Sequence, residues 1–192
     1  MRRMVALLLT GLALAALGLL AGRWLQDPVA AGCEAYRRGD YAAAAEHFDQ
    51  ARQAGKDSPL LSHNQGAALY QLQRYGDADD RYQEAGAKGS ALEAARAAYD
   101  RGNCALRRAC GRDGAPDPKL LGEAIQHYQS CLDRRPAVGD AGTLFDDARH
   151  NLEMAKLLTA KQEDKPDATK PPPDPQTDPQ SAARDHEDLC PV

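Results

Sequence analysis

Residues 32–51, GCEAYRRGDYAAAAEHFDQA, and residues 66–85, GAALYQLQRYGDADDRYQEA, decide the fold of this chain. The second segment follows the first at a shift of 34 residues, and the two align without a gap. Similar residues coincide, namely Gly32 with Gly66, Ala35 with Leu69, Tyr41 with Tyr75, Ala44 with Ala78, Phe48 with Tyr82 and Ala51 with Ala85. A fixed period of this length indicates a repeat architecture, in which each copy is one supersecondary unit.

A third copy of the pattern is interrupted by an insertion. It begins at Gly102 and Ala105 and, after about ten additional residues, resumes at Leu121, Ala124, Tyr128, Cys131 and Pro136. The spacing resembles the tetratricopeptide-repeat (TPR) pattern, in which each repeat is a helical hairpin. We therefore predict an all-α TPR solenoid of three hairpins. The alternative, an unrelated Ala-rich helical bundle, does not account for two gapless copies.

Each recurring position has a physical role in the predicted hairpin. We expect the small residues of the first helices to face those of the second helices at close backbone approach, as Gly32 with Ala44, Gly66 with Ala78 and Gly102 with Ala124. Gly39 should supply the positive φ that favours glycine at a helix end. Because the residue before proline disfavours a helical conformation, Ser58-Pro59 and Arg135-Pro136 should terminate the second helices of repeats one and three.

The predicted domain organisation has three parts. Residues 1–25 form an N-terminal transmembrane signal-anchor, and residues 27–160 form the TPR domain. Its repeats cover about 27–59, 60–92 and 95–137, with an insertion at 110–118, and a capping helix at 140–160 covers the last apolar face. Residues 161–192 are rich in Pro and Asp, cannot bury apolar area, and are predicted to be a disordered tail.

The N-terminal segment from Met4 to Gly22 contains no charged residue and is long enough to span a membrane as a helix. Arg2 and Arg3 precede it, which under the positive-inside rule places the repeats in the periplasm. We predict a single-pass protein of a bacterial inner membrane. The alternative is a cleaved signal peptide that releases the chain to the periplasm, although no good cleavage site follows the apolar run.

The composition excludes several function classes. The formal net charge is −4, and the tail alone carries four basic and eight acidic residues, so the remainder is neutral overall. Without a basic stripe or interleaved aromatics, the sequence predicts no nucleic-acid partner. The five histidines and five cysteines show no metal-ligand spacing, and no phosphate loop or nucleophile motif is present. We therefore expect no enzyme activity, no metal, no cofactor and no small-molecule substrate.

The cysteines admit more than one interpretation outside the cytoplasm, where disulfides form. Cys131 occupies a small core position and should be simple packing, whereas Cys110 opens the insertion and should be accessible. A disulfide that involves Cys104 or Cys110 remains open. Five thiols leave at least one unpaired, which we expect to be Cys190 in the tail.

The predicted binding surface is the concave face of the solenoid, which the first helix of each hairpin forms. Tyrosine, arginine and asparagine side chains suit the recognition of an extended peptide, through amphipathic contacts, paired hydrogen bonds to carboxylates and bonds to the main chain. By register, the residues that should line this face are Tyr36, Arg37, His63, Asn64, Tyr70, Arg96, Tyr99, Asn103 and Arg107, with His150 from the capping helix.

Three segments carry a more specific likeness, namely AYDRGNCAL (residues 98–106), EAIQHY (123–128) and DARHNLEMA (147–155). Together with the N-terminal apolar segment and the Pro-rich tail, they resemble the TPR components of bacterial aerotolerance (Bat) operons, which accompany von Willebrand factor A (VWA) domain proteins. The likeness covers roughly residues 30–160. It implies an interaction scaffold that assembles an envelope complex with VWA-domain membrane proteins. The alternatives are a periplasmic, chaperone-like TPR protein that holds unassembled envelope proteins, or one that holds cytochrome-maturation clients.

Overall fold

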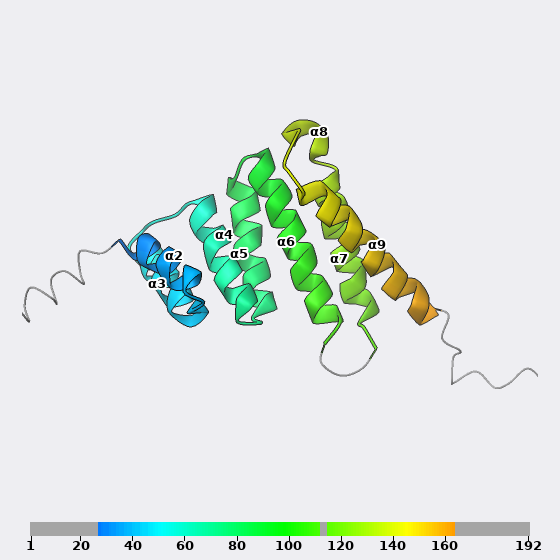
Figure 1. The fold of residues 1–192 in the computed structure, drawn as a ribbon, viewed down its shortest axis with the longest axis horizontal. Helices are drawn as coiled ribbons and strands as arrows, with labels where there is room; N and C mark the ends of the chain where they lie inside the picture. Colours follow the sequence, from blue (N-terminus) through cyan, green and yellow to red (C-terminus); the bar gives the residue numbers. More distant parts are fainter. Residues whose placement is uncertain (1–26, 112–114, 164–192) are drawn as a thin grey trace, which may run out of the picture. The chain divides into compact units, whose positions relative to one another are not determined.

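The computed structural model describes residues 27–111 and 115–163, and these residues form helices joined by short turns (Figure 1). The predicted anchor at 1–25 and nearly all of the predicted tail at 161–192 lie outside the described residues. By its contacts the chain divides into two units, residues 1–162 and 163–192. The helices are α2 (Pro28–Arg37), α3 (Tyr41–Gln53), α4 (Pro59–Gln71), α5 (Tyr75–Lys88), α6 (Ala91–Ala109), α7 (Pro118–Leu132), α8 (Arg135–Val138) and α9 (Leu144–Glu163).

Side-chain caps fix the starts of most helices. Asp27, Asp40, Ser58 and Asp117 each accept a hydrogen bond from a backbone N–H in the first turn of the helix that follows. At α6, Ser90 and the helix residue Glu93 cap each other's backbone N–H groups in a capping box. A cap of this kind stabilises a helix by about 1 kcal/mol, so the polar residues between the repeats define where each helix begins.

Two of the predicted helix ends are wrong. Ser58-Pro59 does not terminate the second helix of repeat one, because α3 already ends at Gln53 and Ser58 caps the start of α4. Proline suits the first helical position, where its missing N–H has no helical partner. Arg135-Pro136 likewise begins the short helix α8, three residues after α7 ends at Leu132. The glycine prediction is confirmed, since Gly39 has φ +80° between α2 and α3.

Three hairpins follow one another along the chain, α2 with α3, α4 with α5 and α6 with α7 (Figure 1). Each second helix also contacts the first helix of the next hairpin, as α3 does α4 and α5 does α6. Helix α9 contributes Phe145, Ala148 and Leu152 to apolar clusters that include residues of α6 and α7. The described part of the chain is thus a stack of helical hairpins with a further helix packed on the third.

The glycines of the first helices face aromatic rings rather than alanines, which corrects the predicted contact. A Cβ built on Gly32 would lie 2.6 Å from the Phe48 ring, and one on Gly66 would lie 2.9 Å from the Tyr82 ring. At Gly102 the same atom would lie 2.5 Å from the Tyr128 ring. All three are second-helix rings of the same repeat. Ala44, Ala78 and Ala124 are fully buried, but the glycines are required by the rings.

No helix within the described residues, 27–111 and 115–163, is both long enough and apolar enough to be a candidate membrane span.

Candidate functional site

The first helices of the three hairpins share one surface, as α4 contacts both α2 and α6. Two pairs of side chains join α4 to α6, and three of the four residues, His63, Tyr70 and Arg107, are predicted binding residues. His63 Nε2 lies 2.9 Å from Asp100 Oδ2, and Arg107 Nε donates to Tyr70 Oη at 3.3 Å. Burial raises the pKa of the Tyr70 phenol, so the oxygen that accepts from Arg107 is neutral at physiological pH. We call the surface of α2, α4 and α6 that carries these residues the groove face.

A pocket of about 340 Å³ lies on the groove face between α2 and α4. Four of its lining residues are predicted binding residues, namely Tyr36, Arg37, His63 and Asn64. The other three, which the sequence does not single out, are Cys33, Phe48 and Ala67. Asn64 Nδ2 lies 3.7 Å from Cys33 Sγ, which joins the two helices across the pocket. The arrangement combines an apolar interior with polar groups at its edge, as a site for one large side chain requires.

Tyr36 and Tyr70 occupy equivalent positions of the first two repeats and make equivalent contacts. The Tyr36 ring meets Tyr41 edge to face at a centroid distance of 5.2 Å, and Tyr70 meets Tyr75 at the same distance. Each pair joins the end of a first helix to the start of its second helix, so both tyrosines are held in place before any ligand binds. Arg37, the neighbour of Tyr36, is exposed and forms an ion pair with Glu34.

Tyr99 and Asn103 lie at the end of the groove face near α9. Asn103 Oδ1 accepts hydrogen bonds from Tyr128 Oη at 2.8 Å and from Asn151 Nδ2 at 3.0 Å. Asn151 also lies 3.5 Å from Tyr99 Oη. Asn151, which sequence reasoning missed, is thus the α9 residue that reaches this surface. Asn151 directly precedes Leu152, which is buried against α6 and α7. Its position next to a core residue is the signal in the sequence that could have identified it.

The remaining predicted residues, Arg96, Arg107 and His150, are exposed. Arg96 and Arg107 are eleven positions apart on α6, three helical turns, and so they share one side of that helix. Within the described residues no carboxylate forms an ion pair with either arginine. His150 lies on the side of α9 away from the buried Ala148 and Leu152. The structure therefore joins Tyr70 to Arg107 and His63 to Asp100, and it leaves Arg96 and His150 free of these contacts.

The four described cysteines, Cys33, Cys104, Cys110 and Cys131, are free thiols. Cys131 is fully buried, as predicted for a packing residue, and Cys110 is exposed, as predicted for an accessible one. Burial raises the pKa of the Cys104 thiol to about 12 and that of Cys131 to about 11, so both stay protonated and unreactive at neutral pH.

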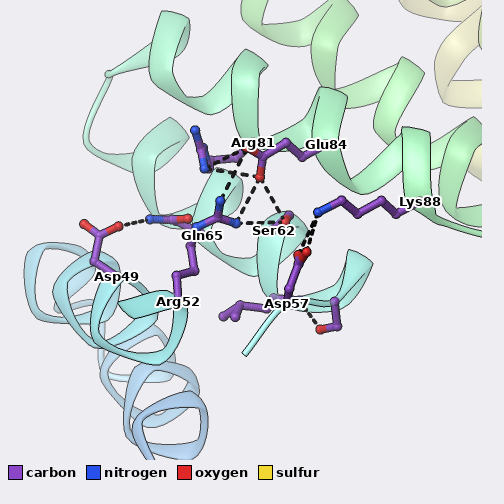
Figure 2. Close-up of polar contacts among 10 residues, drawn as sticks. Asp49, Arg52, Asp57, Ser62, Gln65, Arg81, Glu84 and Lys88 are labelled. Carbon is purple, nitrogen blue, oxygen red and sulfur yellow. Dashed lines mark hydrogen bonds and ion pairs between the residues drawn. The ribbon is translucent and has the colours of Figure 1, made fainter. Parts of the chain in front are cut away.

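A polar network joins side chains of α3, α4 and α5 (Figure 2). Glu84 accepts from Arg52 and Arg81 at 2.9 and 3.0 Å, and Ser62 Oγ donates to the same carboxylate at 3.3 Å. Nearby, Gln65 Nε2 donates to Asp49 Oδ1 at 2.5 Å. We call the site of this network the first cleft. It consists of those six residues and of the ion pair between Lys88 and Asp57 beside them. It is occupied by the chain's own charges.

Comparisons with known proteins support the class of fold. No protein-family model matches the chain, and no curated protein matches it. Among solved structures, the chain is similar to the TPR domain of Sgt2 from Aspergillus fumigatus, with a TM-score of 0.54 and 17% sequence identity. The match covers 78% of this chain and 89% of that domain. The chain therefore has a TPR-like fold of helical hairpins.

Proposed function

We propose that the chain is a non-enzymatic scaffold that holds an extended segment of a partner protein on the groove face. The pocket between α2 and α4 carries this proposal, because it places apolar atoms beside exposed and half-buried polar groups in the middle of a repeat surface. An extended segment binds such a surface by placing one side chain in the pocket and pairing its main chain with polar side chains alongside. Tyr36 and Tyr70 are already held by ring contacts, which lowers the entropy lost on binding.

Features of the sequence support a setting for this scaffold. We place the apolar segment at residues 4–22 in a bacterial inner membrane, with the TPR-like domain in the periplasm, where it assembles an envelope complex with VWA-domain proteins. The resemblance to the TPR proteins of Bat operons supports this partner class. A chaperone-like holder of unassembled envelope proteins is the second candidate, and the predominantly apolar interior of the pocket favours it.

A co-purification experiment from native membranes tests the proposal. The double change of Arg37 and Arg96 to Ala removes two exposed groove arginines that no buried group depends on, so the fold should persist. We expect the partner to be lost or strongly reduced. The matched control is Arg149→Ala, which removes an exposed arginine from α9 that is paired with Asp146. Equal recovery of the partner with wild type and with the double variant, at unchanged helicity, would contradict binding on the groove face.

A further inference from the structure

A second cleft, between α5 and α7 over α6, repeats the architecture of the first but not its charges. A cavity of about 240 Å³ lies in it, and its polar lining residues are Gln83, Arg101, His127, Ser130 and Arg134. The floor consists of small residues, among them Ala94, Ala97 and Ala98 of α6. Gln83 and the lining residue Ala87 are exposed, so the cavity opens to solvent. We call this site the second cleft.

The repeat gives each residue of the second cleft a counterpart in the first. Tyr128 is the counterpart of Tyr82, and therefore Ser130 stands where Glu84 stands and His127 where Arg81 stands. The same alignment puts Arg134 in the place of Lys88. For the helices before them, Gln83 stands in the place of Asp49 and Gly86 in the place of Arg52. At these positions the second cleft keeps one permanently charged side chain, Arg134, and has neither of the two carboxylates.

The two arginines of the second cleft, Arg101 and Arg134, differ in their hydrogen-bond and ion-pair partners. Arg101 is paired with Asp79, at 2.8 Å between Nε and Oδ1. Arg134 donates to Ser130 Oγ at 2.6 Å and to the Ser130 carbonyl oxygen, and among the described residues no carboxylate lies within ion-pair distance of it. Lys88, its counterpart in the first cleft, has such a partner in Asp57 at 2.6 Å. The second cleft therefore contains an arginine, a serine and a cavity where the first contains a complete ion pair.

We propose that the second cleft binds a carboxylate side chain, Glu or Asp, of a partner protein, in the position that Glu84 fills in the first cleft. In the first cleft Glu84 is held by Arg52, Arg81 and the Ser62 hydroxyl at 2.9 to 3.3 Å. In the second cleft Gly86 and His127 replace the two arginines, so the donors to a bound carboxylate would be Arg134 and Ser130. A guanidinium beside a hydroxyl is a donor set suited to a carboxylate, and charge-assisted hydrogen bonds of this type are among the strongest. A cavity of about 240 Å³ has room for one side chain rather than a larger ligand.

This site is distinct from the groove face. On α6, Ala94, Ala98 and Arg101 line the second cleft, whereas Asp100 and Arg107 make the groove contacts to α4. With about 100° of rotation per residue, the two sets point to opposite sides of the helix. A partner could therefore occupy the groove while an acidic residue, from the same or another partner, occupies the second cleft.

The test uses the full chain in detergent and a fluorescein-labelled, end-capped hexaglutamate peptide, with hexaglutamine as the neutral control. We expect Arg134→Gln to weaken hexaglutamate binding by roughly tenfold or more, and Arg134→Lys to retain most of it. Lys88→Gln, the matched change in the first cleft, should alter affinity less than about twofold, because Asp57 already pairs with Lys88. Arg149→Gln, which changes an exposed arginine of α9 outside both surfaces, should leave the affinity unchanged, and Arg107→Gln on the groove face should lower it less than Arg134→Gln does.

A substitution that fills the site gives an independent readout. Ser130→Glu puts a carboxylate at the counterpart position of Glu84, so it should abolish peptide binding. Ser130→Ala removes only a neutral donor and should weaken binding less than Arg134→Gln does. The melting temperature of Ser130→Glu should exceed that of the uncharged, similarly sized Ser130→Gln. The proposal is overturned if hexaglutamate shows no binding at about millimolar concentration. It is also overturned if affinity follows Arg107 rather than Arg134, or if Ser130→Glu binds as wild type does.

Discussion

The two clefts between successive second helices occupy the same place in the repeat but differ in their charged side chains. The first is crossed by Glu84, which joins Arg52 and Arg81, and its charges are satisfied within the chain (Figure 2). In the second, Gly86 replaces the crossing arginine, and a Cβ on Gly86 would lie 3.0 Å from the Cβ of Ala97. The comparison shows that the repeat determines where the helices meet. The side-chain interactions that stabilise each interface differ from one repeat to the next. The first interface holds a carboxylate between two arginines, whereas the second combines one ion pair, Arg101 with Asp79, with close contact between small residues.

The largest expected effect comes from filling the close contact of the second cleft. Gly86→Leu adds a side chain against Ala97, which is buried and cannot retreat, so we expect a loss of about 1–3 kcal/mol in the free energy of unfolding. Gly76→Leu, in the same helix, is the matched control. Nothing lies within 4 Å of a Cβ at Gly76, and stability should be unchanged or slightly higher. Urea titrations of both variants decide the matter, and equal effects would show that the contact is not close.

A smaller effect is expected from breaking the ion pairs of the first cleft. Glu84→Gln leaves Arg52 and Arg81 without a carboxylate, and because these side chains are about one-quarter to one-third exposed, we expect a loss of about 1 kcal/mol. Ser130→Ala at the counterpart position should cost less than about 0.5 kcal/mol. High salt should reduce the Glu84→Gln loss, since screening weakens the pairs that the variant removes. A loss at Ser130 as large as that at Glu84 would remove the distinction between the clefts.

Gln65 provides a still smaller test within the first cleft. Its Nε2 is bonded to Asp49, but its Oε1 is buried with no hydrogen-bond partner among the described residues. Gln65→Met loses the bond and also removes the unsatisfied oxygen, and these changes oppose each other. We expect thermal unfolding to show a net change within about 1 kcal/mol. A loss of about 3 kcal/mol would show that the Gln65 oxygen is satisfied and stabilising.

The smallest expected effect is a pH dependence that the first cleft lacks. Burial lowers the pKa of His127, and the nearby Arg101 lowers it further, so the folded state binds this proton less readily than the unfolded state. Stability should therefore fall as the pH decreases below about 6.5, the ordinary histidine value. Arg81, the counterpart in the first cleft, stays charged throughout this range. Unfolding midpoints at pH 7.5 and 5.5 should differ less in His127→Gln than in wild type, and an unchanged difference would exclude His127 as its source.

Self-comparison of the sequence predicted the helical hairpins correctly, because period and residue size are visible in one dimension. It did not predict which atoms meet. Gly66 was assigned to Ala78, yet its real neighbour is the Tyr82 ring, because the approach of two helices depends on their rotation as well as on their spacing. The sequence likewise predicts a helix end at Ser58-Pro59, although the same two residues equally suit a helix start.

The sequence could predict which residues share the groove face, but it could not predict which of their side chains contact each other. The groove residues share helical register, so the sequence could group them, whereas the bond from Arg107 to Tyr70 joins residues 37 positions apart. Cys33 and Phe48 also line the pocket, but nothing in the sequence marks a cysteine inside a helix or a recurring aromatic position as a binding residue. The second cleft was not predicted either. Its proposed role depends on comparing the surroundings of Ser130 with those of Glu84, and these surroundings are visible only in the structure.

The central claim is that the groove face holds the partner, and site-specific photo-crosslinking tests it most directly. A photoreactive amino acid at position 64, in the pocket, is compared with one at position 153, an exposed site on α9, in the full chain within its native cells. We predict a crosslinked partner band at position 64 that is absent at position 153 and is lost with the double arginine variant. A partner that crosslinks from position 153 but not from position 64 would contradict the claim.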